Sequence, residues 1–106
     1  MNRVAHPDPA ENGLDYLLGW YRQQCDDDWE HEFGIRIATL DNPGWDLEVD
    51  IAGTDLEGRV VERARTELAG GGWMFVASTG QMFQASCDPA SFPLVLAEFR
   101  RFAESA

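Results

Sequence analysis

The feature that most constrains the fold is a pair of alternating segments joined by the turn DNPG at residues 41–44. In residues 35–40, IRIATL, the side chains of Ile35, Ile37 and Thr39 alternate with those of Arg36, Ala38 and Leu40, and in residues 45–51, WDLEVDI, four apolar side chains alternate with three acids. Strict alternation gives a strand one buried and one solvated face, and Pro followed by Gly suits a tight turn. The pattern predicts an antiparallel hairpin whose second strand carries a ladder of three carboxylates on its solvated face.

A helix is predicted before this hairpin from one apolar stripe with helical spacing. The stripe consists of Leu14, Leu17, Leu18 and Tyr21. Asn12 is a suitable N-cap, and three aspartates from residue 26 are unfavourable near a helix C-terminus. We therefore expect the helix to end near Gln24 or Cys25. Tyr16 and Trp20 lie off the stripe and are candidates for exposed aromatic residues.

The second half of the chain predicts further strands and a last helix. Residues 58–69 fit either a helix or an edge strand, and Gly70-Gly71-Gly72 ends whichever forms. Residues 73–79 and 81–87 predict a second hairpin around Gly80. The first of its strands is apolar on both faces, which is typical of a central strand or one covered on both sides.

The last helix is predicted after Ser91 as its cap, with Pro93 in its first turn. Its expected buried stripe is Phe92, Val95, Leu96, Phe99 and Phe102. The order of elements predicts an α+β fold: an antiparallel meander sheet of four or five strands flanked by an N-terminal and a C-terminal helix.

Chain length and net charge limit the classes of protein to which this chain can belong. A chain of 106 residues predicts one domain, which we place at residues 13–106, after a flexible N-terminal arm at residues 1–12 that holds two prolines. The net charge of −11 argues against nucleic acid and anionic membranes as partners. The sequence shows no long apolar run and no signal segment, so we expect a cytoplasmic protein with Cys25 and Cys87 as free thiols.

The acidic residues are concentrated in one segment. Nine carboxylates lie between residues 26 and 50, where Arg36 is the only base and Trp29 and Trp45 are the aromatic anchors. A charged face is often merely solvated, but aromatic residues ringed by charge are common at protein interfaces. The predicted contact residues for a partner are Asp27, Asp28, Trp29, Glu30, His31, Glu32, Asp46, Glu48 and Asp50.

Catalytic and metal-binding interpretations are weaker. His31 lies between two glutamates, but neighbours on an extended chain point to opposite faces, so we expect no metal site and no cofactor. Cys25 precedes three aspartates, whose negative charges disfavour a thiolate nucleophile; we expect it to continue the stripe of the first helix. The alternatives to a binding protein are a small enzyme, sulfurtransferase-like or a hydrolase, using Cys25 or His31, and a small-molecule-binding module lined by Trp29, Trp45 and Trp73.

A series of short motifs resembles the immunity protein 53 family over roughly residues 14–102. The motifs are Trp20-Tyr21, Cys25-Asp26, Trp29-Glu30-His31, Gly34-Ile35 and Thr39-Leu40-Asp41-Asn42-Pro43-Gly44-Trp45, continued by Gly53-Thr54, Leu56 and Trp73. The chain departs from the family where it has Ala85-Ser86-Cys87-Asp88 in place of a Gly-Gly pair.

The resemblance implies a bacterial polymorphic-toxin system, in which such a protein protects the producing cell by binding a cognate toxin domain. It implies a binding protein rather than an enzyme, and it favours a strand for residues 58–69. A basic nuclease is one candidate toxin, because an acidic inhibitor would be steered toward it. The oligomeric state stays open.

Overall fold

The structure is a computed structural model that describes the backbone of residues 9–105 and the side chains of residues 13–105. In chain order its elements are α1 (Pro9–Gln24), α2 (Trp29–Glu32), β1 (Ile35–Leu40), β2 (Gly44–Asp50), β3 (Val60–Glu67), the 3-10 turn η1 (Ala69–Gly71), β4 (Trp73–Thr79), β5 (Met82–Cys87) and α3 (Phe92–Glu104). None of the described helices is long and apolar enough to cross a membrane.

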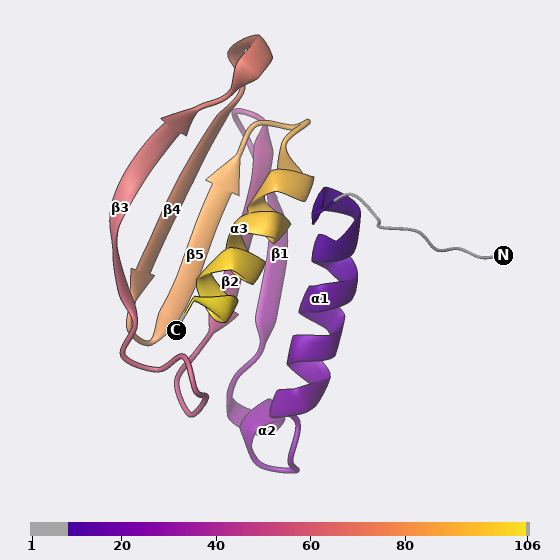
Figure 1. Cartoon of the computed structure of the whole chain (residues 1–106), viewed down its shortest axis with the longest axis vertical. Coiled ribbons are helices and arrows are strands. Elements are labelled where there is room, and N and C mark those ends of the chain that lie inside the picture. The colour runs from indigo at the N-terminus through magenta and orange to yellow at the C-terminus, as the bar shows by residue number, and fades with distance from the viewer. Residues whose placement is uncertain (1–8, 106) are drawn as a thin grey trace, which may run out of the picture.

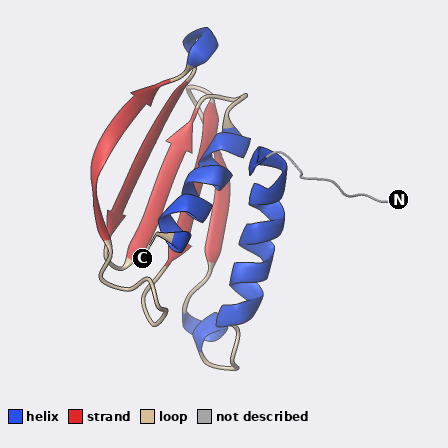
Figure 2. Cartoon of the chain, viewed as in Figure 1, coloured by secondary structure: helices blue, strands red, loops and turns tan. Residues whose placement is uncertain are grey.

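The fold is α+β, as predicted, with one five-stranded antiparallel sheet. Both long helices pack on one face of the sheet (Figure 1), and the described part of the chain leaves the other face without a helix (Figure 2). The strand order is β1-β2-β5-β4-β3, which differs from the expected simple meander. After β2 the chain crosses to the far edge to form β3, and β4 then leads back to β5, which pairs with β2.

The core lies between the sheet and the two helices. The predicted inner face of the first hairpin is confirmed on its second strand, where Leu47, Val49 and Ile51 are fully buried. It is wrong for most of the first strand, where Ile37 is 45% exposed and Thr39 is exposed. Phe83 from β5 meets Phe99 from α3 with ring centroids 5.2 Å apart. The predicted buried stripe of α3 is confirmed at Val95, Leu96 and Phe99, while Phe92 and Phe102 are half-buried against it.

Helix α1 begins and faces differently from the prediction. It starts at Pro9, so Asn12 lies inside the helix and residues 9–12 are not part of an arm; residues 1–8 lie outside the described residues. Its end at Gln24 is confirmed. Leu17 is buried as expected, but Leu14 and Leu18 are 47% and 54% exposed.

The buried face of α1 differs from the predicted face because the helix packs against α3 as well as against the sheet. Gly13 is the close contact, since a Cβ there would lie 2.7 Å from the Leu96 Cβ atom. Trp20, expected to be exposed, is only 7% exposed and packs edge-on against Phe99 at 5.2 Å. A helix with two neighbours buries a wider arc than one apolar stripe predicts.

The helix-free face of the sheet is covered partly by arginine side chains. Residues 60–67 form an edge strand, β3, with a register shift between Val61 and Ala64. The guanidinium of Arg63 lies 4.2 Å from the ring centre of Phe75, and that of Arg65 lies 5.6 Å from a ring of Trp73. The apolar side chains of β4 are therefore covered by the helix layer on one face of the sheet and by arginine side chains in cation–π contacts on the other.

The hairpin turn forms as predicted and brings Gly44 close to the neighbouring strand. A Cβ at Gly44 would lie 2.2 Å from the carbonyl oxygen of Cys87. Backbone cannot move away as a flexible side chain can, so only glycine fits here.

We predict that Gly44→Ala lowers the free energy of unfolding by about 1–3 kcal/mol, because β2 and β5 must separate locally. Gly19→Ala is the matched control. It lies within α1, and an added Cβ there would meet nothing within 4 Å. It should leave stability unchanged or raise it by roughly 0.5–1 kcal/mol. Urea denaturation of both variants checks this, and equal stability of the two would contradict the close approach.

Candidate functional site: the acidic segment

Trp29 anchors the acidic segment to the folded domain. Its side chain is 6% exposed, and its indole Nε1–H donates to the carbonyl oxygen of Ala52 at 2.9 Å. Its ring packs edge-on against Trp20 and Tyr21, each with centroids 6.0 Å away. Gly53 passes so close that an added Cβ would lie 3.3 Å from the Trp29 ring. Trp29, expected among the contact residues, is thus a core residue and lies outside the exposed acidic surface.

Two acids of the segment hold its local shape. The Asp26 carboxylate accepts the backbone N–H groups of Trp29 and Asp28 at 2.9 and 3.0 Å. The Glu30 carboxylate accepts those of Asp26 and Asp27, both at 2.9 Å. Backbone N–H donors stabilise the charged form, so they lower the pKa of both carboxyl groups below its ordinary value. Residues 29–32 form the short helix α2 rather than the extended chain expected around His31.

Four predicted contact residues remain exposed on this scaffold: Asp27, Asp28, His31 and Glu32. Asp27 adopts a left-handed backbone conformation, with φ of 77°, at the turn that leads into α2. Among residues 13–105 no hydrogen bond or ion pair engages the side chains of these four residues. Their charges therefore face solvent.

The three acids of β2 share the helix-free face of the sheet, as predicted, but protein groups engage them. Arg36 donates to Glu48 at 2.9 Å and forms a bidentate pair with Asp50, both bonds 3.1 Å long. Asp50 also accepts the Gly34 N–H at 2.9 Å, and Asp46 accepts from the Gln84 amide at 2.6 Å. One guanidinium thus offsets one of the two charges beside it.

The electrostatics of this cluster follow from these contacts. Hydrogen bonds to Asp50 and Glu48 raise the pKa of Arg36. Burial opposes ionisation of Asp50, but the hydrogen bonds from Arg36 and the Gly34 amide outweigh it and lower its pKa. Two groups of acids therefore differ in character: Asp27, Asp28 and Glu32 around α2 are exposed and uncompensated, and the acids on β2 are partly neutralised.

The basic half of the helix-free face was not predicted from the sequence. Arg63 and Arg65 lie on the same face as the β2 acids, because Arg65 pairs with Phe75 in a register that continues through Ser86 to Asp46. Alternation of Arg63 and Arg65 with small residues was a usable signal, but only once residues 60–67 were known to be a strand. This face therefore has an acidic side on β2 and a basic, aromatic side on β3 and β4.

The cysteines and tryptophans on which the enzyme and small-molecule interpretations depend lie apart from one another. Cys25 is exposed, contrary to the expected core position, and its thiol donates to the Tyr21 carbonyl at 3.3 Å. Cys87 is buried, and burial raises the pKa of its thiol. Trp45, near the start of β2, donates to the Pro89 carbonyl at 3.1 Å beside Phe92, whereas Ala52, the partner of Trp29, follows the other end of β2. Within the described residues no three His, Cys, Asp or Glu side chains form a metal cluster.

We predict that Arg36→Gln lowers the free energy of unfolding at neutral pH by about 1 kcal/mol, because Asp50 loses its bidentate partner. The folded-state pKa of Asp50 lies below its ordinary value of 3.8. Its contribution is therefore present above that value and is lost as pH falls through the lowered pKa. The difference between variant and wild type should shrink on acidification.

Urea denaturation from neutral pH down to about pH 3 checks this prediction. The matched control is Arg101→Gln, because Arg101 is 80% exposed in a pair with Glu98 and should change stability by less than about 0.5 kcal/mol. A pH-independent difference for Arg36→Gln would contradict the assigned role of the Asp50 charge.

Comparison with known protein families matches residues 14–104 to the family described as Immunity protein 53. The match includes α1 from Leu14, the Trp29 anchor, the whole sheet and α3 to its last residue. No curated protein and no solved structure matches the chain. The family match covers most of the sequence and confirms the resemblance carried by the motifs around Trp29 and Gly44: the chain belongs to the Immunity protein 53 family.

Proposed function

We propose that this protein is a cytoplasmic bacterial immunity protein that binds a cognate toxin domain and neutralises it through the exposed acids around α2. Family membership supports an immunity function. The observation that carries the proposed surface is that Asp27, Asp28 and Glu32 are exposed and uncompensated while the scaffold beneath them is fixed. The proposal assigns binding rather than catalysis.

The fixed scaffold matters for affinity. Asp26 and Glu30 hold the loop through four backbone hydrogen bonds, and Trp29 holds α2 to the core. A surface that is ordered before binding loses less conformational entropy when the partner docks. Acids held in place can therefore meet cationic groups of a toxin without first being ordered.

Charge gives the proposal a kinetic consequence. The net charge of −11 creates a negative potential around the molecule. A toxin that acts on nucleic acid would carry cationic groups for phosphate, and a basic nuclease is therefore the favoured partner class. Complementary potentials raise association rates toward ~10⁸–10⁹ M⁻¹s⁻¹ at low salt.

The β2 acids extend the same surface. Gly34, two residues after the end of α2, donates to the Asp50 carboxylate, so the acidic end of the sheet face adjoins the α2 segment. Arg36 reduces the local charge there, and the Asp50 side chain is only 17% exposed. We therefore assign the main contribution to the α2 acids and a supporting one to Glu48.

Co-expression with the toxin domain encoded by the neighbouring gene tests the immunity function. The expected result is rescue of growth together with a purified complex whose affinity falls as salt rises. Absence of both rescue and complex would overturn the proposed function.

We predict that the double variant Asp27→Asn with Asp28→Asn slows association with that toxin domain by roughly tenfold at low salt and flattens its salt dependence. Asparagine tolerates the left-handed conformation of Asp27, so the fold should persist. Stopped-flow or surface-plasmon kinetics at several salt concentrations provide the measurement.

The matched control removes two exposed acids elsewhere, with Asp41→Asn at the hairpin turn and Glu62→Gln on β3. It changes the net charge by the same amount, so it should slow association much less. Equal effects of the two double variants would mean that net charge, rather than the α2 surface, steers binding.

A further inference from the structure

The two edges of the sheet differ in how they resist pairing with another strand. Strand β3 carries a register shift and alternating charges, including Glu62, Arg63 and Glu67, and natural edges use both devices to block further pairing. Strand β1 has an unbroken register from Ile35 to Leu40, with Arg36 its only charged residue. Arg36 is occupied by Glu48 and Asp50, so β1 is the unprotected edge.

The backbone of β1 presents hydrogen-bonding groups at this edge. The Asp50 N–H donates to the Gly34 carbonyl. With this pairing, the backbone groups of the even-numbered residues of β1 face β2 and bond to it. In an antiparallel pair the alternate residues point their N–H and C=O groups away from the partner. Ile37 and Thr39 therefore direct these groups outward, where a sixth strand would pair.

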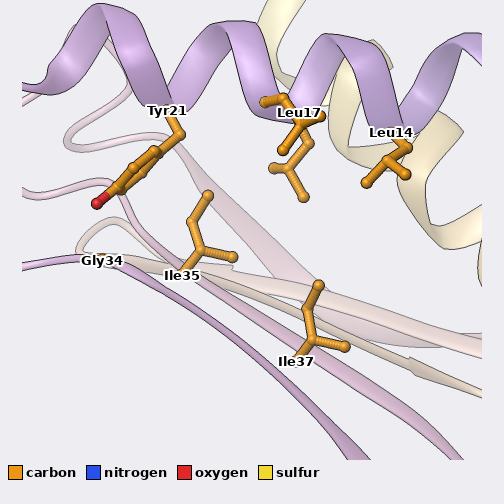
Figure 3. Close-up of a pocket in the computed structure, with 7 residues that line it drawn as sticks. Leu14, Leu17, Tyr21, Gly34, Ile35 and Ile37 are labelled. Carbon is orange, nitrogen blue, oxygen red and sulfur yellow. The ribbon is translucent and has the colours of Figure 1, made fainter.

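A groove lies along the same edge. Helix α1 sits beyond β1, past the outline of the sheet (Figure 1). Side chains of Leu14, Leu17 and Tyr21 point from α1 toward Ile35 and Ile37 on β1 (Figure 3). The groove has a volume of about 320 Å³ and is lined mostly by apolar atoms.

The exposure of the groove residues is unusual for apolar side chains. Leu14, Leu18 and Ile37 are each between 45% and 54% exposed, and they gather in one place rather than being scattered. Contiguous exposed apolar residues mark interaction sites. A strand added to β1 would lie under α1 and cover all three with every second side chain.

We propose that β1 and the overhanging face of α1 receive an extended segment of the toxin domain, which adds a sixth strand to the sheet. This rests on the proposed immunity function and specifies how the toxin is held. The segment would pair with Ile37 and Thr39 and place about three apolar side chains into the groove over six residues. Main-chain bonds would supply affinity, and the groove would select apolar residues at alternate positions.

Charge favours the toxin over a second copy of this chain. Pairing two copies through β1 would bring together two molecules that each carry a net charge of −11, which like-charge repulsion opposes. A segment from a positively charged partner meets attraction instead. The groove edge also continues into the acidic surface, since Gly34 lines the groove and bonds to Asp50.

Amide hydrogen exchange measures the pairing directly. In the free protein the amides of Ile37 and Thr39 should exchange fast, and in the complex with the neighbouring-gene toxin domain at least tenfold more slowly. Arg65 is the internal control, because its amide also points outward, on the opposite edge, and should stay fast. Unchanged exchange at Ile37 and Thr39 in a formed complex would overturn the inference and leave the immunity function standing.

A substitution distinguishes the contribution of the groove to binding from the contribution of charge. Leu18→Glu makes the protein more acidic, so electrostatic steering should persist, yet we expect at least tenfold weaker binding through faster dissociation. Val60→Glu is the control, because Val60 is 69% exposed at the other edge, and it should bind like the wild type. Melting temperatures of both variants check that they fold.

The remaining outcomes are equally decisive. Wild-type affinity for a folded Leu18→Glu variant would overturn the groove. Concentration-dependent protection of Ile37 and Thr39 without the toxin, with a dimer in sedimentation, would assign the edge to a second copy instead. Absence of any toxin complex with the wild type would count against the immunity function itself.

Discussion

The arrangement of the acidic segment depends on the hydrogen bond from the Trp29 indole to the Ala52 carbonyl. This bond ties α2 to the loop after β2, and the aromatic contacts with Trp20 and Tyr21 tie it to α1. A buried polar group left without its partner is costly, so α2 cannot leave the domain cheaply. The acids that flank Trp29 consequently have fixed positions despite their mutual repulsion.

Repulsion is also reduced within the fold. Asp26 and Glu30 bind backbone N–H groups, and Glu48 and Asp50 share Arg36. A segment with nine carboxylates and one arginine is therefore less strained than its composition suggests. The charges that remain exposed are those that the fold does not use, and they are the ones available to a partner.

Much of the fold was predictable because periodicity reports burial directly. Both hairpins, the end of α1 at Gln24 and the buried stripe of α3 follow from local pattern. The strand order was not predictable, since no local signal says that β5 pairs with β2. The orientation of α1 was not predictable for a similar reason. Its contact with α3 at Gly13 is a tertiary contact that no local pattern specifies, and this packing buries Trp20 while it leaves Leu14 and Leu18 exposed.

The acidic site was predicted in composition and not in detail. Sequence could show that Asp46, Glu48 and Asp50 share a face, but not that Arg36 and Gln84 engage them from neighbouring strands. It could show a tryptophan among acids, but not which way the indole points. Register and side-chain direction decide both, and both depend on the assembled sheet.

The residues that carry the family resemblance serve mainly the fold. Trp29 and Gly53 pack against each other, Gly44 fits against Cys87, and Trp45 bonds to Pro89. The exposed acids Asp27, Asp28 and Glu32 lie outside those motifs, as do Leu14 and Leu18 of the groove. A scaffold defined by packing residues leaves such surface positions free to vary without loss of stability. Recognition of one toxin rather than another would then reside in residues that the family motifs do not specify.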